Sequence, residues 1–120
     1  MLEGFEDELY ENGYRPERIY SSHTKDELGA AYEDSFILFE TGEIQLYYGA
    51  RQTLEKAGVT WQKVIIDHLQ GEFGDLDDTQ LALNDAAIAL NTGVIISRYI
   101  FDDGFVDVQT DLEQKLTKVS

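Results

Sequence analysis

Two apolar runs joined by a tight turn near the C-terminus limit the folds open to this chain. Residues 94–101 are rich in β-branched and aromatic side chains, Asp102-Asp103-Gly104 has the composition of a turn, and residues 105–110 alternate apolar and polar side chains. A second turn at residues 112–114 leads into residues 115–119. The pattern predicts three consecutive antiparallel strands.

Apolar side chains in the residues before these strands have the spacing of α-helices. We expect three helices, at residues 50–57, 61–70 and 79–91, and the second carries the clearest amphipathic stripe in the chain. Thr60 precedes the second helix as an N-cap, and Asp77 or Asp78 precedes the third. Gly58 and Gly93 suit the left-handed position that follows a helix.

The N-terminal third of the chain is more polar. Residues 1–34 are expected to form an acidic, partly mobile segment with short helices, one of them starting at the capping-box sequence Thr24-Lys25-Asp26-Glu27. Residues 35–120 are expected to form a single domain. This domain begins with a predicted β-hairpin over residues 35–48, which turns at Thr41-Gly42.

The predicted fold class is α+β, a single domain in which antiparallel β-hairpins pack against about three short helices. No internal repeat or low-complexity tract divides the chain further. The expected core includes Phe36, Leu38, Leu46, Leu54, Trp61, Val64, Ile65, Leu69, Leu83, Leu90, Ile96, Ile100, Val106 and Val108.

The chain is strongly acidic, with 24 Asp and Glu residues against 9 Lys and Arg residues and a net charge of −15. Phosphate backbones and anionic lipids are bound by basic residues, so this charge argues against direct binding to nucleic acid or to a membrane. The chain has no Cys, no apolar run near the ~20 residues of a membrane span, and an acidic N-terminus where a signal peptide is basic. We therefore expect a cytoplasmic protein.

His68 lies in the densest cluster of chemically versatile side chains. An imidazole beside Glu72 and Asp75 can act as a general base or a metal ligand. His68 also lies on the apolar stripe of its helix, which favours a mostly buried side chain hydrogen-bonded to the loop at residues 71–78. The aspartates of residues 75–78 offer oxygen ligands, but the calcium-loop spacing is absent and helix capping explains them. We predict no metal and no cofactor.

Motifs for nucleophilic catalysis are absent from the sequence. There is no G-x-S-x-G, Walker or dinucleotide-binding pattern. Ser21 and Ser22 lie beside His23, but in a segment expected to be a polar linker, and Ser97 lies within a predicted strand. We therefore predict that the protein is not an enzyme.

Acidic residues are concentrated where basic residues are missing. No Lys or Arg occurs between Lys63 and Arg98, and this interval carries six Asp or Glu residues. We predict an acidic edge, defined as Glu72, Asp75, Asp77, Asp78 and Asp85, as the main partner-binding surface. The N-terminal acids Glu3, Glu6, Asp7 and Glu8 are expected to support it. A charged run that serves only solubility is the alternative.

An H-x-x-G-[DE]-aromatic-G-D element spans residues 68–75, with His68, Gly71, Phe73 and Gly74 as its structural positions. Together with Asn84, Gly93, Ser97, Arg98, Tyr99, Thr110 and Thr117, it makes residues 49–119 resemble a family described as plasmid-related proteins, which are small products of plasmids and other mobile elements. Phe73 stands where that family has Trp, and an Arg expected between residues 110 and 115 is missing. The resemblance implies an α+β domain on a mobile element, and no activity.

Three classes of function remain open. The first is a phage- or plasmid-encoded inhibitor that occupies a basic nucleic-acid-binding surface of a host defence complex, as an anti-CRISPR or anti-restriction protein and DNA mimic. The second is a mobile-element accessory or regulatory module that binds a host protein without mimicking DNA. The third is a small enzyme centred on His68. We expect the first, with a protein partner, and leave self-association as a homodimer open.

Overall fold

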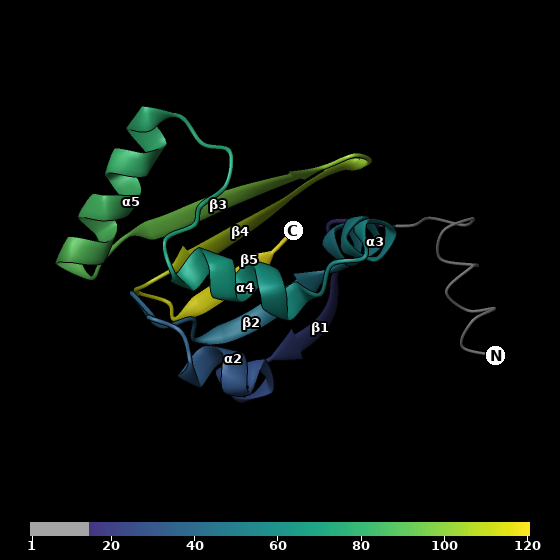
Figure 1. Cartoon of the computed structure of the whole chain (residues 1–120), viewed down its shortest axis with the longest axis horizontal. Helices are drawn as coiled ribbons and strands as arrows, with labels where there is room; N and C mark the ends of the chain where they lie inside the picture. Colours follow the sequence, from purple (N-terminus) through teal and green to yellow (C-terminus); the bar gives the residue numbers. More distant parts are fainter. Residues whose placement is uncertain (1–14) are drawn as a thin grey trace.

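The computed structural model describes residues 15–120, which form a five-stranded sheet with helices packed on it (Figure 1). The elements, in chain order, are β1 (Ile19–His23), the 3-10 helix η1 (Lys25–Leu28), α2 (Ala30–Glu33), β2 (Glu43–Tyr47), α3 (Tyr48–Ala57), α4 (Trp61–Leu69), α5 (Asp78–Leu90), β3 (Val94–Phe101), β4 (Gly104–Asp111) and β5 (Leu116–Val119). The strand order is β1-β2-β5-β4-β3. Neighbouring strands are antiparallel except β2 and β5, which are parallel. The predicted α+β class is confirmed, with a mixed sheet.

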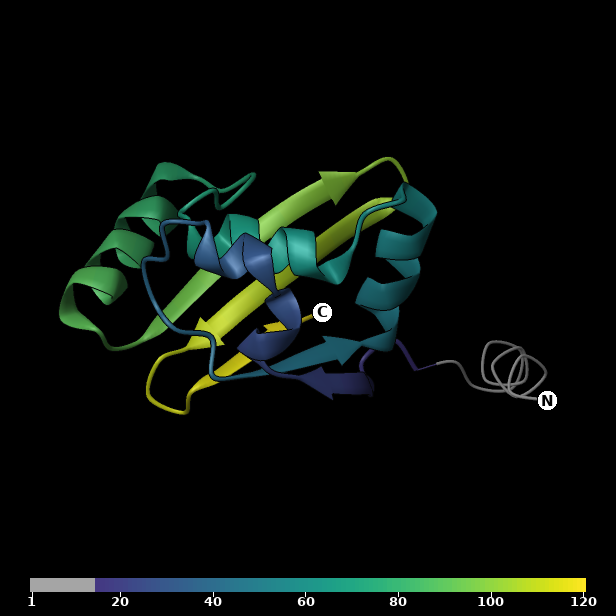
Figure 2. The same cartoon turned by 60° about the horizontal axis from the view of Figure 1, so that its bottom comes forward.

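One face of the sheet carries the core, and α3 and α4 pack on it (Figure 2). Side chains alternate along each strand, so Ile44 and Leu46 of β2 and Val106 and Val108 of β4 are buried on the same side. They belong to one cluster with the buried helical residues Ala50, Leu54, Val64, Ile65 and Leu69. The stripe predicted for residues 61–70 is therefore the helical side of the core.

Helix ends follow the predicted capping residues, with one exception. Thr60 and Asp77 accept backbone N–H groups from the first turns of α4 and α5, at 3.2 and 2.8 Å. Gly58 ends α3 with a left-handed φ of 72°. At the end of α5 the left-handed position is Asn91, with φ 55°, and not Gly93 as predicted. Asn tolerates this conformation because its short polar side chain hydrogen-bonds locally.

The predicted hairpin over residues 35–48 is wrong. Only β2 forms in that range, and it pairs with β1 on one side and with β5 on the other. The segment before it is irregular because it runs back to the helices: Leu38 N donates to Leu69 O at 2.9 Å, and Phe39 and Thr41 are buried. The sheet thus begins before residue 35, since the segment expected to be a polar linker contains β1.

The core prediction is confirmed for Leu46, Leu54, Val64, Ile65, Leu69, Val106 and Val108, which are all buried. It is wrong for Phe36, Leu38, Leu83, Leu90 and Ile100, which are exposed by 79, 36, 57, 72 and 60 %. Ile100 fails because β3 turns Ile95 and Ser97 inward, which places every second residue on the opposite face. The leucines of α5 fail because that helix buries its Asn84 side instead.

Candidate functional site

His68 lies at the centre of a buried chain of hydrogen bonds. Its side chain has no exposed surface, and its Nδ1 and Nε2 atoms lie 2.5 Å from Ser97 Oγ and 3.0 Å from Thr110 Oγ1. Thr110 Oγ1 in turn lies 2.8 Å from Thr117 Oγ1, which donates to the backbone oxygen of Thr41 at 2.7 Å. The burial of His68 is as predicted, but its partners are not in the loop at residues 71–78.

The donor at one end of this series of hydrogen bonds determines which atom carries the proton in each of the others. Thr117 uses its hydroxyl proton on a carbonyl, so it accepts from Thr110. Thr110 then has no proton left for His68 and must accept the Nε2 proton of the imidazole. Nδ1 of neutral His68 therefore accepts from Ser97. With this assignment, the neutral imidazole and the three hydroxyl groups all have hydrogen-bond partners.

Burial also favours the neutral form of His68. Desolvation lowers the pKa of the imidazole to about 3, because the charged form loses its hydration inside the core. With no exposed surface and both nitrogens engaged, His68 has no atom free to meet a substrate. The hypothesis of an enzyme centred on His68 therefore does not fit this geometry, and the residue has a structural role.

The H-x-x-G-[DE]-aromatic-G-D element covers the exposed edge of β3. Arg98 N donates to Phe73 O at 2.9 Å, and Asp75 N donates to Arg98 O at 2.8 Å, so Gly74 forms a parallel bridge to β3. The Phe73 ring is buried and meets the His68 ring edge-on at 6.1 Å between centroids. Gly71 lies just after α4 with φ 89°. The element thus links the His68 cluster to the edge of the sheet.

Asn84 protects the next position of the same edge. Its side-chain amide donates to Ile96 O at 2.7 Å and accepts from Ile96 N at 3.1 Å, so it replaces a neighbouring strand. An unprotected edge strand is a site for unwanted pairing with other chains. This contact holds α5 beside the sheet, and it explains why a polar residue is buried there.

The five residues of the acidic edge are all exposed. Glu72, Asp75, Asp77 and Asp78 follow one another through the loop into α5, and Asp85 lies two helical turns further along the face of Asp78. Within residues 15–120, no basic side chain lies within ion-pair distance of these carboxylates. The supporting acids Glu3, Glu6, Asp7 and Glu8 lie outside the described residues.

Basic side chains near this edge have other partners. Lys63 Nζ contacts Asp67 Oδ2 at 2.7 Å, and the pKa of Lys63 is raised chiefly by that hydrogen bond. Arg98 binds both carboxylate oxygens of Asp107, at 2.8 and 2.9 Å, and its pKa is raised first by that pair and more weakly by Asp75. The negative charge of the acidic edge is therefore left largely uncompensated.

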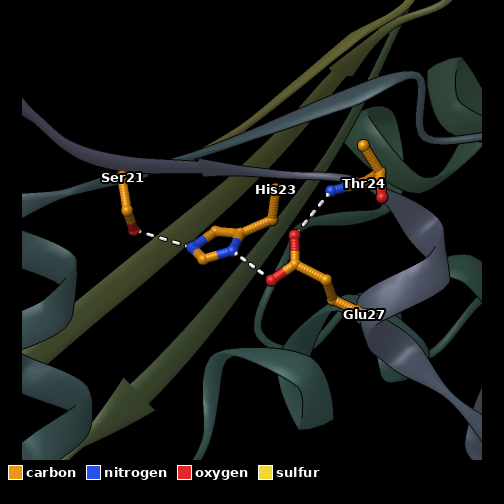
Figure 3. Close-up of polar contacts among 4 residues, drawn as sticks. All are labelled: Ser21, His23, Thr24 and Glu27. Atoms are coloured by element: carbon orange, nitrogen blue, oxygen red, sulfur yellow. Dashed lines mark hydrogen bonds and ion pairs between the residues drawn. The ribbon is translucent and has the colours of Figure 1, made fainter.

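A second polar cluster lies on β1 and η1 (Figure 3), and it includes Ser21 and His23, which were expected to lie in a polar linker. Ser21 Oγ lies 2.7 Å from Nε2 of His23, and Nδ1 of His23 lies 2.8 Å from Oε1 of Glu27. The other carboxylate oxygen of Glu27 accepts the backbone N–H of Thr24 at 3.1 Å. The pKa of Glu27 is lowered, first by the hydrogen bond to His23 and then by that to Thr24.

The sequence contained a signal for this cluster. Ser21 and His23 are two residues apart, so they share a face as soon as the segment is a strand. Glu27 is the third helical residue of the capping box that the sequence predicted, and its carboxylate therefore points back to the start of η1. The interpretation of this segment as a linker hid the pattern.

A cavity of about 510 Å³ opens beside Ser21 and His23. Leu46, Leu54, Val59, Tyr20 and Trp61 give it mostly apolar walls. The His23 ring stacks on Trp61, with ring centroids 4.3 Å apart and an angle of 26°. Arg51 also lines the cavity, where its guanidinium lies 4.2 Å from the centre of the Tyr20 ring and 3.1 Å from Glu55.

The part of the chain that the structure describes contains no group of three His, Cys, Asp or Glu side chains able to hold a metal ion. None of the helices within residues 15–120 has the length and apolar character to cross a membrane. Comparisons with family models, curated proteins and solved structures found no match. Function must therefore be inferred from the geometry of the chain itself.

Proposed function

We propose that the protein is an acidic inhibitor from a phage or plasmid that binds a basic, nucleic-acid-binding surface of a host defence complex. The proposed target is a restriction or CRISPR complex. The protein would bind it by mimicking the charge of DNA. The observation that carries the proposal is the acidic edge, whose five carboxylates are exposed and have no ion-pair partner within residues 15–120. Complementary charge speeds association and selects the partner.

α5 also exposes large apolar side chains outside the acidic edge. Leu83 and Leu90 are exposed by 57 and 72 %, and they lie seven residues apart on one helical stripe. Asp85 is two residues from Leu83, so the helical rotation places it on the other flank of α5, on the same face as Asp78. The proposed occupant of the acidic edge is therefore a basic protein surface, and the two leucines offer a separate apolar contact.

Binding without DNA mimicry is the second candidate, and the two leucines favour it. In that case the protein is a mobile-element accessory module, and its affinity comes mainly from apolar contact. The two candidates respond differently to salt, because screening weakens exposed charge pairs and leaves apolar contacts largely unchanged. The resemblance of residues 49–119 to plasmid-related proteins is compatible with both.

The first test replaces the acidic edge with neutral isosteres: Glu72→Gln, Asp75→Asn, Asp77→Asn, Asp78→Asn and Asp85→Asn. Asn caps a helix about as well as Asp, so the fold should be kept. DNA cleavage by a panel of restriction and CRISPR complexes is measured with each protein. We expect the parent to inhibit at least one complex, more strongly at low salt, and the variant to associate with that complex at least about tenfold more slowly.

A matched control neutralises five other exposed acids: Asp26, Glu33, Glu40, Glu43 and Asp103. Its net charge changes by the same amount, so it should inhibit nearly as well as the parent if the acidic edge is the contact surface. Equal inhibition by the folded acidic-edge variant at low salt would remove the acidic edge from the interface. Absence of inhibition across the panel would count against the defence-complex target.

A further inference from the structure

We infer that Ser21, His23 and Glu27 form a hydrolytic triad that cleaves esters of apolar carboxylic acids bound in the neighbouring cavity. This activity goes beyond the proposed function, does not depend on it, and departs from the prediction that the protein is not an enzyme. β1 lies at the opposite edge of the sheet from β3 and α5, so the two surfaces are separate (Figure 1).

The connectivity of the hydrogen bonds is the first argument. Glu27 is an acceptor for Nδ1–H of His23, which leaves Nε2 without a proton and facing Ser21 Oγ. That is the tautomer in which an imidazole can remove the hydroxyl proton of a serine nucleophile. Glu27 is itself held by the backbone N–H of Thr24, so the three side chains are ordered as nucleophile, base and orienting acid (Figure 3).

The local backbone supplies the second argument. Ile19 pairs with Tyr47 and Ser21 pairs with Leu46, so Tyr20 is an extra residue in β1. Such bulges redirect side chains and occur often beside active sites. Here both Tyr20 and Ser21 line the cavity, although consecutive residues of a regular strand point to opposite faces. The bulge therefore brings the nucleophile to the cavity wall.

The cavity defines the class of substrate. Its volume of about 510 Å³ suits a small molecule, and its walls are largely aliphatic and aromatic. An acyl or aryl group would lie between Leu54, Val59 and Trp61, with its carbonyl carbon at Ser21. Arg51 and Glu55 line the same wall as an ion pair, so this wall carries both signs of charge.

The reaction consumes one ester and one water. Ser21 Oγ bonds to the carbonyl carbon as its proton passes to Nε2 of His23, and the ester C–O bond breaks as that proton passes to the departing alcohol. Water then attacks the acyl-serine, giving a proton to Nε2 that returns to Ser21 Oγ as the carboxylic acid is released. Glu27 keeps the imidazole oriented and stabilises its charged form in both halves.

The test uses two probes on the full chain: an alkyl fluorophosphonate, which labels activated serines, and p-nitrophenyl butyrate. We expect the fluorophosphonate label on Ser21, located by mass spectrometry of the digested protein, and ester hydrolysis above the rate in buffer. Ser21→Ala should abolish both. Glu27→Gln should lower the hydrolysis rate by about a hundredfold, while Gln keeps the capping interaction with Thr24.

Ser22→Ala is the matched control. Ser22 is the next residue of the same strand, it is exposed, and it does not line the cavity. It should keep the labelling and hydrolysis rates of the parent within twofold. Circular dichroism establishes that each variant is folded. The inference is overturned if the folded parent is not labelled at Ser21, if Ser22→Ala and Ser21→Ala lose activity equally, or if hydrolysis survives in Ser21→Ala. In each case the three side chains form only a structural hydrogen-bond chain.

Discussion

Acidification from pH 7 to pH 4 is expected to lower the free energy of unfolding of the parent by about 3 kcal/mol more than that of a His68→Gln variant. The folded pKa of His68 is about 3, whereas an exposed imidazole titrates near 6.5. Below pH 6.5 the unfolded chain therefore binds a proton that the folded chain does not. The contribution of His68 to the free energy of unfolding therefore falls between pH 6.5 and pH 3 and is constant below that range.

Urea unfolding, followed by the fluorescence of Trp61 at several pH values, measures the difference. Both proteins carry the same carboxylates and the same His23, so the contributions of those groups cancel in the comparison. At pH 7 the variant should already be less stable, by about 1–3 kcal/mol, because a flexible Gln side chain loses more conformational entropy than an imidazole when it is held between Ser97 and Thr110. Parallel loss of stability in the two proteins would show that His68 is not held neutral by its surroundings.

Local patterns predicted the regular elements well. The stripe at residues 61–70, the caps at Thr60 and Asp77, and the strands from residue 94 onward depend on side chains close in sequence, and the structure confirms them. The pairing of β2 with β5 joins segments about 70 residues apart, and no short-range pattern encodes it. A strand that pairs with distant partners was therefore mistaken for half of a local hairpin.

Contacts between distant residues also limited the prediction of the polar clusters around His68 and Ser21. Burial of His68 follows from its helical stripe, but its partners Ser97 and Thr110 are 29 and 42 residues away and could not be assigned from spacing. Ser21, His23 and Glu27 lie close in sequence, but the first two were assigned to a linker, and their alignment with Glu27 depends on β1 being a strand. Exposure of the acidic edge could be expected from charge alone, since unpaired carboxylates avoid the core.

Gly74→Ala is expected to lower the free energy of unfolding by at least about 3 kcal/mol. Gly74 has φ 79°, and a Cβ atom there would lie 2.1 Å from Arg98 O, which is backbone and cannot move aside. The chain would have to give up the two hydrogen bonds that join Phe73 and Asp75 to Arg98, in addition to the strain of a left-handed alanine. Urea unfolding gives the total cost, and hydrogen exchange of the Arg98 amide reports the loss of the bridge.

Gly58→Ala separates the two causes of destabilisation, which are backbone strain and the loss of the hydrogen bonds to Arg98. Gly58 has nearly the same φ, 72°, but no atom lies within 4 Å of the position that a Cβ would take. Its replacement should cost only the backbone strain, about 1 kcal/mol, and should leave exchange at Arg98 unchanged. If both alanines cost the same, the contact between Gly74 and Arg98 is loose, and the loop at residues 71–78 is not fixed to the edge of β3. The loop carries four of the five acidic-edge residues, so its attachment also decides how rigidly those carboxylates are presented to a partner.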